Sequence, residues 1–411
     1  MGIMNQAIEA AAAPAVNLTW PARYSELPKE VFHRQDIYQR ELERIFYGPE
    51  WHPVAHACEV PNPGDFKTFR IGEAPILIIR GDDQRVRVFL NSCTHRGTQL
   101  ETRVRGRAAE LECPYHRWLF NNRGELMACP GHERFPAAFD KQDYGLRELR
   151  SADFKGLVFA TMSREAPTLD DYLGEVRPFL ATILGGDGRL HLLGYQKVCF
   201  AANWKEYNDN EGYHAPLLHR AFRLLRWQGG TGTFLVTDRG HFGMEAELRD
   251  SANAEFLNDP SIVQFKDRRV APRSTITALF PATVIVKHCD VMNVRFAFPI
   301  SVDEVEIHYA YFYHADDDPE MIRHRLRQSS NLLGPSGLIS LEDGAVFNRL
   351  HRGDGAPGTV SYQKGVASYD QPPGYAFEQN DEAGNMAKWE YYIKVMGFAR
   401  AAAHPASNGS R

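Results

Sequence analysis

The sequence predicts an α+β protein with a small all-β domain followed by a larger domain that has a curved antiparallel sheet and flanking helices. Three observations support this class. The 411 residues are too many for one small module. Short alternating runs broken by Pro and Gly fill residues from about 51 to 162. Longer strand-like runs, with helical stretches at both ends, fill most of the remaining chain.

The N-terminal part predicts a helix. Residues 31–51, VFHRQDIYQRELERIFYGPEW, have apolar side chains near helical spacing with charges between them. They predict an amphipathic helix that ends at Gly48 and Pro49. The expected domain boundaries are residues 1–47 for a helical segment that packs on the large domain, 48–163 for the small domain and 164–411 for the large domain.

Composition and charge exclude several classes of protein. The hydrophobic share of 43% and the charged share of 24% are typical of a globular protein. A net charge of -5 gives no reason to expect nucleic acid or an anionic membrane as a partner. The N-terminal stretch does not resemble a signal peptide, and no apolar run reaches membrane-spanning length. The six scattered cysteines do not form a disulfide framework, so we expect a cytoplasmic protein.

The most informative stretch of the small domain is residues 91–120. Cys93 and His95 form a C-x-H pair, seventeen residues follow, and Cys113 and His116 form a C-x-x-H pair. These ligands suit either a tetrahedral zinc or a Rieske [2Fe–2S] cluster. Zinc fingers usually carry both cysteines in one knuckle, whereas here each knuckle offers one thiolate and one imidazole. The spacing therefore favours the two-iron cluster, and zinc is the alternative.

Strand-like runs follow one another in the large domain. Helical stretches are expected at 205–227 and 319–334, a second polar segment follows at 336–353, and residues after about 395 resemble a frayed end. The expected strands are 188–204, 231–238, 241–248, 274–280, 282–289, 291–300 and 305–314.

The large domain offers a second set of metal ligands. The segment EGYHAPLLH supplies His214 and His219, and a turn loosened near Pro216 would bring both rings to one point. A mononuclear Fe(II) oxygenase centre needs two histidines and one carboxylate. Asp343 is the expected third ligand and Glu342 its rival, although acidic residues at helix starts also serve as caps.

Together these features resemble the large (alpha) subunit of the Rieske non-haem iron ring-hydroxylating oxygenases over nearly the whole chain. The resemblance is carried by the two Cys-His knuckles, by NWKEYNDNEGYHAPLLH (203–219) and by GPSGLISLEDGAVFNRLHRG (334–353). The last stretch is similar to one in the branch of terephthalate, benzoate, anthranilate and salicylate oxygenases. The ligands that the resemblance implies are Cys93, His95, Cys113 and His116 for the [2Fe–2S] cluster, and His214, His219 and Asp343 for mononuclear iron.

The family also implies a residue that connects its two metal centres. Its members carry an acidic side chain three positions before the first iron-binding histidine, and this side chain bonds to a cluster histidine of a neighbouring subunit. Here Glu211 holds the position, where many members have Asp, and His116 is the matching cluster ligand. A carboxylate there would orient a metal-bound imidazole, so Glu211 is the expected catalytic residue. Arg117 stands where many relatives have glycine.

The resemblance implies a terminal oxygenase component that hydroxylates an aromatic ring with O2, and the expected substrate is a small aromatic carboxylate. Its electrons would come from NAD(P)H through a separate reductase, with or without a ferredoxin. The family implies an α3β3 assembly with a small beta subunit or an α3 homotrimer. One alternative is a Rieske monooxygenase or demethylase acting on another substrate. A different class is a Rieske electron-transfer protein without oxygenase activity.

Arg295 is the expected substrate-binding residue. It lies within the apolar run VMNVRFAFP, and a buried charge needs a partner. A bidentate pair with a substrate carboxylate would satisfy it, and an internal salt bridge is the alternative. The pocket walls are expected from the segment after His219 and from the strands. The candidate wall residues are Phe222, Leu224, Leu225 and Trp227, whereas His288, His308 and His314 are expected to be structural.

Overall fold

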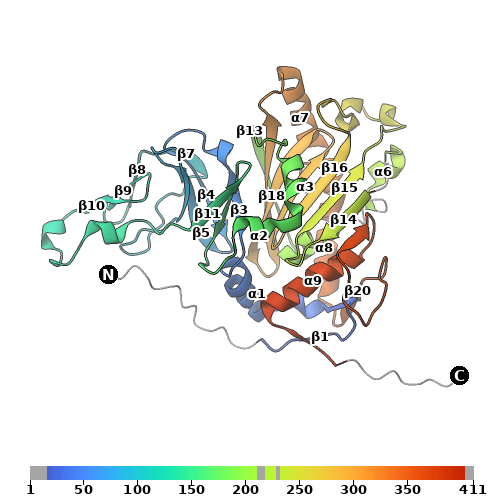
Figure 1. Ribbon diagram of the computed structural model, residues 1–411, viewed down its shortest axis with the longest axis horizontal. Coiled ribbons are helices and arrows are strands. Elements are labelled where there is room, and N and C mark those ends of the chain that lie inside the picture. Colours follow the sequence, from blue (N-terminus) through green and yellow to red (C-terminus); the bar gives the residue numbers. More distant parts are fainter. Residues whose placement is uncertain (1–15, 211–217, 228–231, 403–411) are drawn as a thin grey trace. The chain divides into compact units, whose positions relative to one another are not determined.

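The computed structural model describes residues 16–210, 218–227 and 232–402. Within these ranges the chain divides into two compact units. The first is Leu42–Leu169, and the second combines residues 16–41 with those from Asp170 onward. Figure 1 shows the short strands of the first unit and the broad sheet of the second. The predicted α+β class is therefore confirmed.

Three small antiparallel sheets form the first unit. Their strand orders are β6-β5-β4-β7, β10-β9-β8 and β11-β12-β3. The middle of β5 (Ala74–Arg80) is the apolar run Ile76–Ile79, which is buried on both faces of its sheet. The other strands are β3 (His52–His56), β4 (Asp65–Ile71), β6 (Val86–Leu90), β7 (Arg105–Arg107), β8 (Glu110–Glu112), β9 (Leu119–Asn121), β10 (Leu126–Ala128), β11 (Arg150–Phe154) and β12 (Leu157–Thr161).

An eight-stranded antiparallel sheet organises the second unit, with the order β13-β19-β18-β17-β16-β15-β14-β21. Strands β18 and β19 pair from Met292–Phe312 to Ser301–Glu304, so a tight turn joins them. The strands are β13 (Leu190–Phe200), β14 (Gly232–Val236), β15 (Phe242–Glu247), β16 (Arg273–Leu279), β17 (Thr283–His288), β18 (Val291–Ser301), β19 (Glu304–His314) and β21 (Ala376–Glu378).

The two faces of this sheet have different neighbours. A Cβ atom added at Gly243 would meet the ring of Phe179, so α3 (Arg177–Ile183) lies against the face to which Gly243 points. Phe242 and Met244 point to the opposite face because side chains alternate along a strand. There they line a pocket to which α8 contributes. The second unit also contains α1 (Gln35–Glu41), α4 (Trp204–Asn208), α6 (Arg220–Leu224), α7 (Pro319–Asn331), α8 (Ser340–Asp354) and α9 (Ala383–Met396).

The helix expected at 31–51 is interrupted. The chain forms a 3-10 turn at Lys29–Phe32, the α1 helix at Gln35–Glu41 and a π-helix at Leu42–Phe46. The helical stretch expected at 205–227 consists of α4 and α6, and residues 211–217 between them lie outside the described residues.

The frayed end expected after residue 395 is wrong for its first residues. Gly397 ends α9 with a φ of 68°, and strand β22 (Ala399–Arg400) then pairs in parallel with β1 (Thr19–Trp20). The ring of Trp20 stacks on that of Phe398 with 6.1 Å between their centroids, and this aromatic packing also holds the residues that follow α9 in place. Among the described residues, no helix is both long and apolar enough to cross a membrane.

Candidate functional site

The two Cys-His loops of the first unit repeat one backbone turn. The amide of Gly97 donates to the Cys93 carbonyl at 2.9 Å, and the amide of Arg117 donates to the Cys113 carbonyl at 3.0 Å. The cysteine amides donate in turn to the carbonyls that follow Gly97 and Arg117: the Cys93 amide donates to Thr98 and the Cys113 amide to Trp118, both at 2.8 Å. The loops therefore present their side chains from equivalent frameworks, as a centre that takes one Cys and one His from each loop requires.

This repeated turn explains the unusual position of Arg117. Gly97 has a φ of 74° and Arg117 has a φ of 61°. Both are in the left-handed region, which costs an L-residue other than glycine roughly 1–2 kcal/mol. Arg117 thus occupies a position for which glycine is suited, and its guanidinium forms an ion pair with Glu112. Arginine in place of glycine at position 117 therefore changes the backbone preference of this turn as well as its charge.

The four candidate cluster ligands of the small domain lie close together. The thiols of Cys93 and Cys113 are buried within one apolar core. The rings of His95 and His116 have centroids 4.6 Å apart, and His95 stacks on Trp118 at 4.7 Å. The Nδ1 atom of His116 is buried without a hydrogen-bond partner in the described part of the chain.

Their chemistry fits a metal centre. Burial raises the pKa of the Cys93 thiol, with a further contribution from Cys113, so a thiolate here needs a bound cation. The buried Nδ1 atom of His116 has no hydrogen-bond partner in the described part of the chain, so it is available to bind a metal ion.

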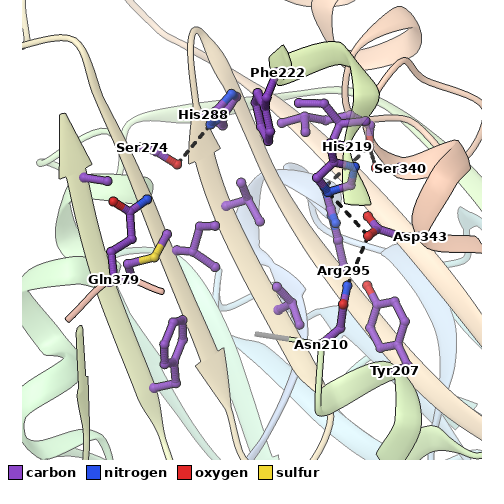
Figure 2. A pocket seen from close by; sticks show the side chains of 18 of the residues that line it. Tyr207, Asn210, His219, Phe222, Ser274, His288, Arg295, Ser340, Asp343 and Gln379 are labelled. Atoms are coloured by element: carbon purple, nitrogen blue, oxygen red, sulfur yellow. Dashed lines mark hydrogen bonds and ion pairs between the residues drawn. The ribbon is translucent and has the colours of Figure 1, made fainter. Parts of the chain in front are cut away.

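In the second unit, the side chains of His219 and Asp343, two of the three ligands expected for mononuclear iron, lie close together. His219 directly precedes α6, and Asp343 lies in the first turn of α8. Nε2 of His219 lies 3.5 Å from Oδ1 of Asp343, and Asn210 donates to the same oxygen at 3.3 Å (Figure 2). His214 and Glu211 lie outside the described residues, so their roles stay predictions.

The two candidate carboxylates of α8 have different surroundings. Asp343 faces Nε2 of His219, whereas Glu342 lies 3.6 Å from the Nδ1 atom of the same ring. Glu342 also accepts a hydrogen bond from the amide of Arg220 at 2.9 Å. Asp343 therefore fits the ligand position better, and Glu342 is placed to orient the imidazole.

A pocket of about 180 Å³ opens beside His219 and Asp343. Its walls are mostly apolar and aromatic and come from the sheet, α6 and α8. Phe222 and Trp227 line it as the sequence predicted. Leu225 is fully buried and Leu224 is 58% exposed, and neither is part of the wall. An apolar pocket with a few convergent polar groups is typical of a small-molecule site.

Arg295 also lines this pocket. Its guanidinium lies over the ring of Tyr309 at 5.1 Å, and Nη2 reaches the Leu333 carbonyl at 3.5 Å. Its Nε atom is buried without a partner, and no Asp or Glu of the described residues forms an ion pair with it. The internal salt bridge considered from the sequence is therefore absent from the described part of the chain. Arg295 is a half-buried cation that lines the pocket, and its Nε atom is buried.

The sequence reasoning assigned another role to His288, which is a pocket residue. His288 was expected to be structural, but it lines the pocket beside Trp227. It follows Val284 and Val286 in β17, and the alternation of that strand places all three on one face. This alternation was the signal that could have identified it. His308 and His314 are structural as expected, because they pair with Glu306 at 2.6 Å and Asp187 at 3.0 Å.

Comparisons with known proteins agree with this arrangement. Residues 50–145 match the model of the Rieske [2Fe-2S] domain, and residues 184–384 match that of the ring hydroxylating alpha subunit catalytic domain. Anthranilate 1,2-dioxygenase large subunit from Burkholderia cepacia is 33% identical over 91% of this chain and 94% of that protein. Terephthalate 1,2-dioxygenase terminal oxygenase component subunit alpha 2 from a Comamonas species is 31% identical over 87% and 92%.

Solved structures show the same fold. Naphthalene 1,2-dioxygenase from a Rhodococcus species, bound to indole, has a TM-score of 0.79 at 24% identity and covers 90% of this chain and 94% of its own. The chain belongs to the family of Rieske ring-hydroxylating oxygenases, as a large (alpha) subunit. The cofactors of this family are a Rieske [2Fe–2S] cluster and a mononuclear non-haem iron, as the resemblance implied.

Proposed function

We propose that this oxygenase hydroxylates a single-ring aromatic carboxylate whose carboxylate binds Arg295. The observation that carries the proposal is the half-buried guanidinium of Arg295, which lines the pocket with a buried, unpartnered Nε atom and forms no ion pair with an acidic side chain of the described residues. A buried charge is costly unless it is paired, and a carboxylate can accept two parallel hydrogen bonds from a guanidinium. Relatives named for anthranilate and terephthalate act on acids of this kind, which supports the proposal.

The size of the pocket supports a single ring. Its volume of about 180 Å³ is close to that of an apolar cavity of ~150 Å³ that binds benzene. Val284 and Val286 of β17 and Phe222 of α6 contribute apolar side chains to its walls. Such walls exclude water and orient a flat ring. The polar groups lie at more than one place in the pocket: Asn210, Arg295 and Asp343 lie near His219, whereas Ser274, His288 and Gln379 line other parts of it (Figure 2).

We propose the following residue roles. Cys93, His95, Cys113 and His116 hold the cluster, His214, His219 and Asp343 hold the mononuclear iron, and Glu211 connects the two centres. When bound, the cluster supplies single-electron transfer and the mononuclear iron supplies oxygen activation. Asp343 and Glu342 meet the His219 ring from its two nitrogens and fix its orientation. Arg295 fixes the substrate, and the apolar walls keep the site dry.

The test is a single turnover of chemically reduced holoenzyme with O2 and a panel of benzoates, phthalates and salicylates, with products identified by mass. Wild-type enzyme should hydroxylate at least one carboxylate. Arg295→Gln should lower the rate constant of the single turnover at subsaturating concentrations of that acid by roughly 10- to 100-fold, because hydrogen bonds to charged groups contribute ~1.5–3 kcal/mol. The matching benzamide lacks the charge and should show little change. Equal losses for the acid and the amide would contradict the role of Arg295.

We also propose an α3β3 assembly or an α3 homotrimer that receives electrons from a reductase, with or without a ferredoxin, in the cytoplasm. Relatives named as large or alpha subunits support a smaller partner subunit. All six cysteines are free, which fits a reducing compartment. Native mass spectrometry of the chain, expressed alone and with a small subunit, should show a trimer or a hexamer. A stable monomer under both conditions would contradict the assembly.

A further inference from the structure

Two histidines and an aspartate from distant parts of the second unit meet away from the pocket. His33 follows the 3-10 turn Lys29–Phe32, Asp303 lies in the turn between β18 and β19, and His351 lies in α8. Nε2 of His351 lies 3.1 Å from Oδ1 of Asp303, and Nδ1 of His33 lies 3.7 Å from the same oxygen. One possible ligand atom of each residue lies within 4.8 Å of the others.

This spacing suits a cation with tetrahedral coordination. With bonds of about 2.0–2.1 Å, neighbouring ligand atoms of a tetrahedral zinc lie roughly 3.3 Å apart. The 3.1 Å and 3.7 Å separations at Asp303 bracket this value. Small side-chain movements would therefore complete the coordination geometry. Asp303 is 62% exposed, so a cation can enter from solvent and keep a water as its fourth ligand.

A fourth residue supports one of these ligands. Oε2 of Glu206 lies 3.0 Å from Nδ1 of His351, on the side of the ring away from Asp303. A carboxylate on the second nitrogen of a metal-bound imidazole is the usual support for such ligands, because it fixes the ring and strengthens the donor nitrogen.

We propose that His33, Asp303 and His351 form a second metal site that takes a divalent cation of the zinc class. Two imidazoles and one carboxylate suit such a cation. The site is separate from the candidate iron centre, because His351 lies two helical turns beyond Asp343 in α8, roughly 12 Å along the axis. A bound cation would join the N-terminal segment and the β18–β19 turn to α8, and it would stabilise the folded chain by mass action.

The experiment is a calorimetric titration of the iron-loaded holoenzyme with Zn²⁺ alone. Wild type should bind one more equivalent than His33→Ala or Asp303→Asn. The control is His308→Ala, which removes a histidine of similar exposure that also pairs with a carboxylate, and it should bind as wild type does. Asp303 lies in an exposed turn, so its variant keeps the test independent of folding. Equal stoichiometry in wild type and both variants would overturn the proposal.

An observation inside the pocket carries a second inference, which rests on the proposed function. His288 is buried, and its Nδ1 atom contacts Ser274 Oγ at 3.0 Å. Its Nε2 atom is buried without a partner in the described part of the chain, and the side chain lines the pocket. Burial and the nearby Arg295 lower the pKa of His288 to about 4, so the ring is neutral. A neutral imidazole with one unused nitrogen can bond an uncharged polar group.

We infer that His288 recognises a hydroxyl or amino substituent on the ring of the aromatic acid. Arg295 binds the carboxylate, and a second carboxylate would find no positive charge at a neutral His288. A substituent that meets Nε2 would satisfy a buried atom, whereas an unsubstituted ring would leave that atom unpaired. The substrate class is therefore a hydroxybenzoate or aminobenzoate.

Anaerobic calorimetry with the holoenzyme would compare benzoate with the isomeric hydroxy- and aminobenzoates. Wild type should bind at least one substituted acid roughly 5- to 10-fold more tightly than benzoate, since a neutral hydrogen bond contributes ~1 kcal/mol. His288→Leu should lose this preference and keep its affinity for benzoate, and His288→Gln should keep part of it. An equal change for both acids would overturn this inference alone. Absence of binding by any acid in wild type would overturn the proposed function as well.

Discussion

The Nε2 atom of His219 lies 3.5 Å from Oδ1 of Asp343, and Nδ1 of the same ring lies 3.6 Å from Glu342. Two neighbouring carboxylates of one helix thus meet one imidazole from both nitrogens. This is possible because α8 begins just before them and its first turn projects both acidic side chains towards the start of α6. The arrangement separates the two roles that the sequence alone left open between Asp343 and Glu342.

Asp343→Ala should therefore abolish turnover and lower the mononuclear iron content, while the visible spectrum of the cluster stays normal. Replacing residues that only support a metal ligand costs about 10–100-fold in affinity or activity, and loss of a ligand should cost more. Iron analysis with single-turnover product assays measures both effects. Full iron occupancy and full turnover in this variant would exclude Asp343 as a ligand.

Glu342→Gln is the matched control in the same helical turn. The amide can still accept the hydrogen bond from the Arg220 amide but loses its charge beside His219. We expect iron to bind and turnover to fall by no more than ~10–100-fold. A larger loss than that of Asp343→Ala would reverse the two assignments.

Asp209 should position the segment that leads to the iron ligands. Its partly buried carboxylate accepts hydrogen bonds from Asn385 at 2.8 Å, from Trp389 at 3.1 Å and from the Tyr362 hydroxyl. Asp209→Ala would leave these donors without their acceptor, at ~1–3 kcal/mol for each buried group. We expect a lower melting temperature and reduced iron content with an unchanged cluster spectrum. The exposed Asp238→Ala should behave as wild type, and equal behaviour of the two variants would contradict the role of Asp209.

The sequence predicted local features of this chain better than long-range contacts. Short strands were predicted between about residues 51 and 162, and the structure has them there, for example at Asp65–Ile71 and Ala74–Arg80, because alternation and turn residues define such strands locally. The helix Ala383–Met396 was missed. Its apolar residues surround the helix, and eleven of its fourteen residues are buried, so it lacks the amphipathic pattern that identifies surface helices.

In the candidate site, too, the local features were predicted and the long-range contacts were not. The spacing of Cys93 and His95 indicated a metal centre because both residues belong to one short loop. The pocket role of His288 depends on the pairing of β17 with its neighbours and on what lies above the sheet. The alternation of β17 places His288 on the same face as Val284 and Val286, but the tertiary structure decides that this face lines a pocket.

Arg325 should contribute strongly to the stability of the large domain. It is 1% exposed, and its guanidinium pairs with Asp317 at 2.6 Å and Asp267 at 2.7 Å. Arg325→Met would leave two carboxylates without this partner, and breaking a buried pair in this way costs about 3–5 kcal/mol. Chemical denaturation followed by tryptophan fluorescence measures the change.

Arg269→Met provides the comparison for that variant. Arg269 contacts the same two aspartates, but its side chain is 41% exposed. Solvent can hydrate the groups that it leaves, so the loss in free energy of unfolding should be clearly smaller. Equal losses for the two variants would show that burial of Arg325 is not what makes its ion pairs important.

Buried neutral histidines should make the folded chain sensitive to acid. Burial lowers the pKa of His241 to about 3 and that of His52 to about 4, from an ordinary value of 6.5. At a pH between each lowered pKa and 6.5, the folded state therefore binds fewer protons than the unfolded state. Their contribution to stability is complete above pH ~6.5 and is lost as the pH falls towards 4, by ~1.4 kcal/mol per pH unit for each group.

His241→Gln tests this sign at one position. The neutral ring of His241 donates from Nε2 to the Tyr172 carbonyl at 2.9 Å and accepts from the Phe280 amide at 3.0 Å. A glutamine amide offers one donor and one acceptor but does not titrate. The free energy of unfolding would be measured by denaturant titration from pH 8 to 4.5. Below pH ~6.5 it should fall less steeply in the variant, because unfolding of the variant takes up about one proton fewer, which corresponds to ~1.4 kcal/mol per pH unit. The two slopes should coincide above that pH, and an unchanged slope below it would mean that His241 is protonated in the folded chain.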